Sequence, residues 1–165
     1  MAGLLDELMK TEAGNSGGGR PPIHSAKQNS ADDPDWSEDD WRKVWDGKIA
    51  VSSRGRALLH GGHRAGKGWP GKSEFPASWT RSDMIEATKL TWRHPDAFRM
   101  SGDRRAARRV VNGVMVEVQA YGPRFRIFRE SVPLSGEGVF KNTPDGKIRL
   151  TLNKGVLDEE GWDRG

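Results

Sequence analysis

Residues 108–120 read RRVVNGVMVEVQA, a stretch with a regular apolar pattern. Valines recur at every second position after the Asn112-Gly113 pair, so that Val114, Val116 and Val118 share one face. This alternation is typical of a strand with one buried face. An Asn-Gly pair favours a two-residue hairpin turn, because both residues tolerate positive φ. The stretch therefore predicts strand, turn and strand, an antiparallel hairpin.

The segments around this hairpin extend the pattern. Downstream, residues 124–132 (RFRIFRESV) predict a further strand, and Pro144-Asp145-Gly146 predicts the turn of a second hairpin. Upstream, Thr80 and Asp83 form a capping box that begins a helix, and Pro95 ends it. Ile85, Thr88 (or Lys89) and Trp92 would share its buried face. The order of loop, helix and consecutive antiparallel strands predicts an α+β fold.

The chain outside this core divides into segments of different composition. Residues 1–35 are rich in Gly, Ser, Asn, Pro and Asp, and we expect a disordered tail. Residues 36–50 carry Trp36, Trp41 and Trp45, which predict a short helical lead that docks on the domain and ends at Gly47. We expect the main domain over 51–155, with 51–79 mostly loop, and a C-terminal tail over 156–165.

Composition and charge restrict the classes of function. The 165 residues include no cysteine, which excludes disulfides and thiolate metal sites. No apolar run is long enough to span a membrane, and the start MAGLLDELMK does not resemble a signal peptide, so we expect action in a cytoplasm, either that of the producing cell or that of a target cell. Residues 1–50 hold six Lys/Arg against ten Asp/Glu, whereas residues 51–165 hold twenty-one against thirteen. A basic domain of this kind favours nucleic acid as its partner.

Two basic features could serve such a partner. Arg104, Arg105, Arg108 and Arg109 precede or enter the hairpin, either tracking an RNA backbone or forming a solvated face. Residues 66–73 read GKGWPGKS and match the phosphate-binding P-loop pattern. A P-loop requires a helix that begins at the Lys-Ser pair, and Pro76 would lie in the first turns of that helix. The pattern therefore does not predict a nucleotide site.

His60 and His63 stand three residues apart in LLHGGHRAGKGWPGKSEF and allow three hypotheses. A metal site would need a third ligand, for which Glu74 is the only nearby carboxylate. A solvated glycine-rich loop would give the histidines no role. In metal-independent RNA cleavage, the histidines would supply base and acid, and a lysine would stabilise charge on the phosphate. No cofactor is needed for the third hypothesis.

The segments GGHRAGKGWPGKSEFPASW and SDMIEATKLTWRHPD resemble the bacterial branch of the EndoU endoribonuclease family over roughly residues 55–142. The resemblance implies a barnase-like α+β domain that cleaves RNA, with tRNA as one candidate, to a 2′,3′-cyclic phosphate without a metal. Members of this family often act as toxins or effectors, so the resemblance also implies a cognate immunity protein. The VVNGVMVEV hairpin fits the family as well.

The resemblance also implies site residues. His60 and His63 would be base and acid in either order, and Lys72, or alternatively Lys67, would support the phosphate. The residues expected to bind RNA are Arg64, Lys67, Trp69, Ser73 and Ser131. Glu130 and Val132 stand where the family has Thr and Tyr. This departure motivates a second hypothesis, an RNA- or protein-binding module that has lost catalysis.

Overall fold

The computed structural model describes residues 36–165 of the chain, and the tail expected to be disordered lies outside them. The helical elements are α3 (Glu38–Asp46), α4 (Arg81–Arg93) and the 3-10 turns η1 (Pro123–Phe125) and η2 (Lys154–Asp158). The strands are β1 (Lys48–Val51), β2 (Ala57–His60), β3 (Ser73–Glu74), β4 (Ala97–Ser101), β5 (Arg104–Val111), β6 (Val114–Tyr121), β7 (Ile127–Gly136), β8 (Phe140–Thr143), β9 (Gly146–Arg149) and β10 (Asp163–Arg164). None of these helices is long and apolar enough to cross a membrane.

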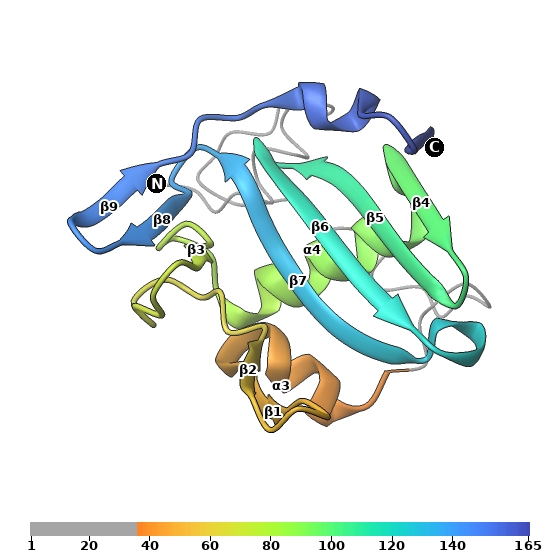
Figure 1. Cartoon of the computed structure of the whole chain (residues 1–165). Helices are drawn as coiled ribbons and strands as arrows, with labels where there is room; N and C mark the ends of the chain where they lie inside the picture. The colour runs from red at the N-terminus through yellow and green to blue at the C-terminus, as the bar shows by residue number, and fades with distance from the viewer. Residues whose placement is uncertain (1–35) are drawn as a thin grey trace.

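The centre of the fold is an antiparallel five-stranded sheet with the strand order β10-β4-β5-β6-β7. Helix α4 crosses one face of this sheet, and the opposite face, here called the open face, is turned toward the viewer (Figure 1). Strands β1 and β2 form a separate hairpin, and β3, β8 and β9 form a small sheet. The expected α+β class is therefore confirmed.

The hairpin predicted from Asn112-Gly113 joins β5 and β6. Val111 pairs with Val114, and the two turn residues have φ of 48° and 77°. Val114, Val116 and Val118 are completely buried on the face that packs against α4. Burial of a valine stabilises the fold by roughly 1.5–3 kcal/mol, so this row anchors the core.

Helix α4 begins at the predicted capping box. The Thr80 hydroxyl accepts a hydrogen bond from the Asp83 amide at 3.1 Å, and the Asp83 carboxylate accepts one from the Thr80 amide at 2.9 Å. Thr88 and Trp92 are buried as expected, whereas Ile85 is only half-buried and Met84 and Ala87 are buried instead. Ala87 and Thr88 are small, which lets the helix approach the sheet closely.

Replacing Thr80 by alanine should remove half of this capping box. We expect Thr80→Ala to lower the free energy of unfolding by about 1 kcal/mol, the usual cost of losing an N-cap hydroxyl. Urea denaturation would measure the loss. Ser82→Ala, at an exposed position of the same helix, is the control and should leave stability unchanged or slightly raised. Equal stability of Thr80→Ala and the parent protein would contradict the capping role.

The two ends of the described chain belong to the same fold as the sheet. Trp36, just before α3, packs its ring 5.1 Å from Trp92 and 4.8 Å from Phe128, measured between ring centroids. At the other end, the stretch expected to be a tail forms η2 and β10. Leu157 is buried, and Asp163 pairs with Phe98 at the edge of the sheet. Both segments therefore help to close the core.

Candidate functional site

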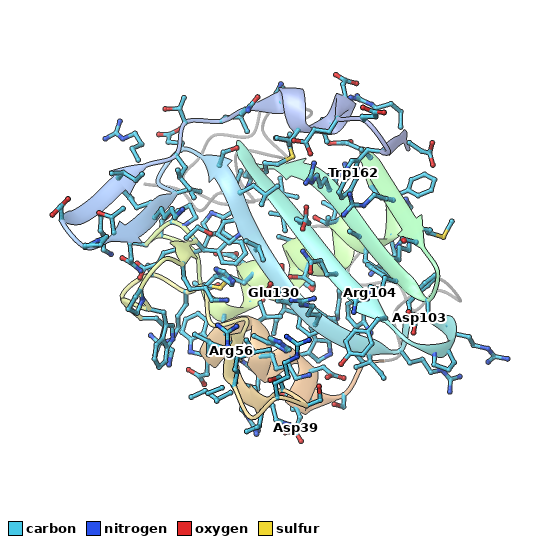
Figure 2. The ribbon with its side chains drawn as sticks, in the orientation of Figure 1. Asp39, Arg56, Asp103, Arg104, Glu130 and Trp162 are labelled. Carbon is cyan, nitrogen blue, oxygen red and sulfur yellow. The ribbon has the colours of Figure 1, made fainter. Side chains whose placement is uncertain are left out.

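The open face of the sheet is hollowed into a groove with a volume of about 760 Å³. Residues from β4, β5, β6 and β7 form its floor, and the β2 strand of the hairpin forms a wall. Glu130 and Arg104 lie on this near face of the sheet, with Trp162 beyond them (Figure 2). The lining residues are Leu58, His60, Arg99, Ser101, Arg104, Arg105, Ala106, Gln119, Ala120, Tyr121 and Arg129.

Three guanidinium groups give the groove a positive charge. Within residues 36–165, no carboxylate lies within the 4.0 Å limit of an ion pair from Arg99, Arg104 or Arg129. Of the neighbouring arginines of β5, Arg108 pairs with Glu117 and Glu159, both at 2.6 Å. Arg105 also lines the groove but lies over the Trp92 ring, as Arg99 lies over the Trp162 ring. Unpaired cations along a groove attract a polyanion.

His60 is the titratable imidazole of this groove. It ends β2, is half-buried and lines the groove wall. Burial lowers the pKa of His60 below its usual value, and the positive charge of Arg129 lowers it further. Glu130 acts in the opposite direction, more weakly. His60 is therefore neutral near pH 7 and able to accept a proton.

Glycines fix the hairpin that carries His60. Gly61 and Gly62 have φ of 73° and 72° and pass over the end of α3. A Cβ at Gly61 would lie only 2.1 Å from the Lys43 carbonyl oxygen, and the Gly62 amide donates to that same oxygen at 2.9 Å. The GG pair thus lets the chain turn tightly against the Trp-rich lead.

His63 lies away from the groove and is only 2% exposed. Its Nδ1–H donates to the Ser73 carbonyl oxygen at 2.8 Å, and its Nε2 faces Glu130 Oε1 at 3.2 Å. Both ring nitrogens of His63 are therefore engaged within the protein. His63 is therefore a buried partner of Glu130 rather than a second accessible imidazole.

Three hydrogen-bond donors lie next to a single carboxylate oxygen of Glu130, Oε1. Besides His63, the Gly61 amide donates to Oε1 at 3.1 Å, and Lys72 Nζ lies 3.5 Å away. Lys72 also donates to the Leu59 carbonyl oxygen at 2.9 Å. Burial alone would raise the pKa of Glu130, but the hydrogen bond and charge of His63, the charge of Lys72 and the Gly61 amide outweigh it and lower the pKa to about 2.

The GKGWPGKS stretch forms a loop around a carboxylate of its own chain. The Gly66 and Gly68 amides donate to Glu74 at 3.1 and 2.7 Å, and Asn142 and Lys147 donate at 2.9 and 2.8 Å. Burial alone would raise the pKa of Glu74, but these four donors outweigh it and lower the pKa to about 2. Ser73 begins β3 rather than a helix. The anion that this loop binds is therefore internal.

The other residues expected to bind RNA are dispersed. Arg64 and Lys67 contact Asp46 at 3.4 and 3.8 Å, on the α3 side of the loop. The Trp69 ring lies 5.6 Å from Lys67 Nζ. Ser131 is fully buried on the α4 side of the sheet, where it accepts a hydrogen bond from Thr88 at 2.8 Å. The groove lining thus contains none of Arg64, Lys67, Trp69, Ser73 and Ser131. His63, Lys72 and Glu130 do lie together, but they lie beside the groove and not in its lining.

Sequence reasoning missed several groove residues, namely Arg99, Arg129 and Gln119. Arg99 belongs to β4, which no local pattern predicts, and Arg129 falls inside the strand predicted over 124–132 without a signal of its own. The alternation of β6 did contain a signal for Gln119 and Tyr121, because both fall on the face opposite Val118 and Ala120.

Within residues 36–165, no group of three or more His, Asp or Glu side chains is arranged to hold a metal ion. Comparison of the chain with models of protein families, with curated proteins and with solved structures found no match.

Proposed function

We propose that this protein is an endoribonuclease with a barnase/EndoU-like domain, which cleaves RNA by attack of a 2′-hydroxyl on the neighbouring phosphate. The observation that supports this proposal is the groove, where one accessible imidazole with a lowered pKa lies among three guanidiniums without carboxylate partners. Such a set supplies a base and a cationic phosphate site, two of the three requirements of this reaction; the third is an acid for the leaving oxygen.

The reaction follows from the chemistry of these groups. Neutral His60 takes the proton of the 2′-hydroxyl, O2′ forms a bond to phosphorus, and the bond from phosphorus to O5′ breaks. Arg129 and Arg104 stabilise the charge that develops on the phosphate oxygens. The departing O5′ needs a proton, and we assign its delivery to Tyr121, whose side chain belongs to the groove.

The two other residues expected to be catalytic take supporting roles in this proposal. His63 is buried and has both ring nitrogens engaged, so it does not meet the substrate. Lys72 holds the Leu59 carbonyl oxygen and Glu130, and its charge acts on His60 although Lys72 does not line the groove. The sequence hypothesis of a His60–His63 acid–base pair thus becomes a pair of His60 and Tyr121.

A second function is favoured by one observation: the engagement of His63 would also suit a binding module that has lost catalysis. In that case the groove would hold RNA without cutting it. Incubation of the purified protein with tRNA and total RNA in excess chelator, followed by analysis for 2′,3′-cyclic phosphate ends, separates the two functions. Cleavage products support the enzyme, and a gel shift with intact RNA supports the binding module.

The expression of the gene offers a cellular form of this test. If the protein acts as a toxin or effector, induced expression of the parent protein should arrest growth in a bacterial host, and expression of His60→Ala should not. Equal growth arrest by both proteins would argue against RNA cleavage as the cause.

The guanidiniums should govern affinity for RNA. We expect the double variant Arg104→Ala/Arg129→Ala to weaken RNA binding and to reduce the slope of log affinity against log salt by about 1.4, because each lost phosphate contact on a single strand contributes about 0.7. Fluorescence anisotropy at several salt concentrations measures the slope. Arg149→Ala on β9, which is exposed and outside the groove, is the control with an unchanged slope. An unchanged slope in the double variant would exclude the groove as the RNA site.

A further inference from the structure

Strand β7 contains a β-bulge next to the groove. Gln119 of β6 pairs with Glu130, but the next residue, Ala120, pairs with Phe128, so Arg129 is an extra residue in β7. Phe128 and Ser131 are both buried toward α4, although they are three positions apart. Regular alternation would turn one of them to the open face. The bulge therefore gives the open face two consecutive side chains, Arg129 and Glu130.

These two side chains have different neighbours. Arg129 lines the groove, and its charge acts on His60. Glu130 instead reaches the foot of the β1–β2 hairpin and accepts a hydrogen bond from the Gly61 amide at 3.1 Å. Lys72, which contacts the same carboxylate oxygen, donates to the Leu59 carbonyl oxygen at 2.9 Å. The peptide groups immediately before and after His60 are thus both held by one ion pair.

This arrangement matters because the hairpin has few other attachments near the groove. Ile49, Val51 and Leu58 of β1 and β2 are 60%, 73% and 40% exposed, so their side chains add little packing against the sheet. On the side of α3, the attachment consists of backbone contacts of Gly61 and Gly62 with the end of the helix. On the side of the sheet, it consists of Glu130 with its partners Gly61, His63 and Lys72.

We propose that Glu130, placed by the bulge and paired with Lys72, is a positioning residue that fixes His60 in the groove. The expected effect of Glu130 on catalysis rests on the proposed function. Its effect on the position of His60 does not, because that position can be observed without any substrate. Glu130 does not touch RNA in this proposal, since its carboxylate is 14% exposed and already faces three donors.

The variants Glu130→Gln and Glu130→Ala test the role. In Glu130→Ala we expect kcat to fall roughly 100-fold, the scale of loss when a reacting group is displaced by about 1 Å. KM and the affinity for RNA should stay within about threefold of the parent, because the groove keeps its guanidiniums. Glu130→Gln keeps an oxygen for the Gly61 amide, so it should lie between the parent and Glu130→Ala.

NMR spectroscopy can observe the environment of His60 directly. In NMR titrations of the histidine side chains, His60 should shift its signals in both variants, and its pKa should fall further, because the carboxylate that favours the charged form is gone. The signals of His94, which is exposed at the end of α4, should be unchanged. The pH at which cleavage reaches half of its maximum should move down with the pKa of His60.

Controls separate positioning from general destabilisation. Glu74→Gln removes another buried carboxylate with a similarly lowered pKa but with no contact to Leu59 or Gly61. It should retain parental kcat at a temperature where the protein is folded. Lys72→Met combined with Glu130→Ala should cost less than the product of the single effects, since both residues act through the same contact.

The positioning role of Glu130 and the ribonuclease proposal can fail independently. Unchanged His60 signals and unchanged kcat in folded Glu130→Ala would overturn the positioning role and leave the ribonuclease proposal intact. A parent protein that binds RNA without cleaving it would overturn the ribonuclease proposal, while altered His60 signals in the variants would still support the positioning role. If Glu130→Ala does not fold, Glu130→Gln and Lys72→Met decide by the same NMR signals.

Discussion

Replacing His60 by alanine should reduce RNA cleavage by about 10²–10⁴-fold, the contribution typical of a general base. The fall should be in kcat, because the guanidiniums that bind the phosphate backbone stay in place. Single-turnover cleavage of a short labelled RNA measures the effect. His94→Ala provides a matched control, since His94 is exposed at the C-cap of α4 and lies outside the groove.

The pH dependence of cleavage gives the same base a second test. His60 must be neutral to accept a proton, so activity should be full above its pKa and be lost as the pH falls through it. Burial and Arg129 lower that pKa, so the loss should begin below the ordinary histidine value of about 6.5. An activity that rises as the pH is lowered through this range, or full activity in His60→Ala, would remove His60 from the mechanism.

Replacing Glu74 should have the largest effect on stability. Glu74→Ala leaves the Gly66 and Gly68 amides and Asn142 without their acceptor, and we expect the free energy of unfolding to fall by roughly 2–4 kcal/mol. Glu74→Gln keeps an acceptor oxygen and should cost less. Urea denaturation at pH 7 measures both, and Glu137→Ala, at an exposed position, is the control.

The loss of stability at low pH should depend on Glu74. The pKa of Glu74 is lowered from 4.5 to about 2 in the folded protein, so the folded state binds its proton less readily than the unfolded state. The resulting stability is present above about pH 4.5 and is lost as the pH falls toward 2. Glu74→Gln should therefore lose less stability than the parent between pH 5 and pH 3. Identical acid profiles would contradict the internal anion site.

The occupied loop also predicts a behaviour toward nucleotides. Because Glu74 already receives the amides that a phosphate would use, ATP and GTP should not raise the melting temperature of the protein. Stabilisation by either nucleotide that Lys72→Ala abolishes would instead show that the GKGWPGKS loop binds phosphate despite Pro76.

Local signals in the sequence were sufficient for much of the fold. The Asn112-Gly113 turn and the alternating valines identified β5 and β6, and the Thr80–Asp83 box identified the start of α4. These features depend on residues within a few positions of each other. The order of helix and strands then gave the α+β class.

The site depended on contacts that no local pattern reveals. His60 and Arg129 line the same groove although sixty-nine positions of sequence separate them, and the bulge that aims Arg129 and Glu130 follows from the pairing of two strands. Glu130 was read as the loss of a family residue, but the structure gives it three donors. Likewise, the basic run of β5 contributes only Arg104 freely to the groove, since Arg105 and Arg108 are engaged in packing and ion pairs.

The bulge makes the site sensitive to the number of residues in β7 as well as to their identity. Deleting Arg129 would restore regular alternation between Phe128 and Ser131, so the remaining single residue alone would face the groove side. In a library of variants, many single substitutions in β7 should therefore leave RNA cleavage intact, whereas deletion of one residue from the strand should abolish it. Homologous chains, once aligned, should keep the spacing of this strand constant as well as the side chains at positions 129 and 130.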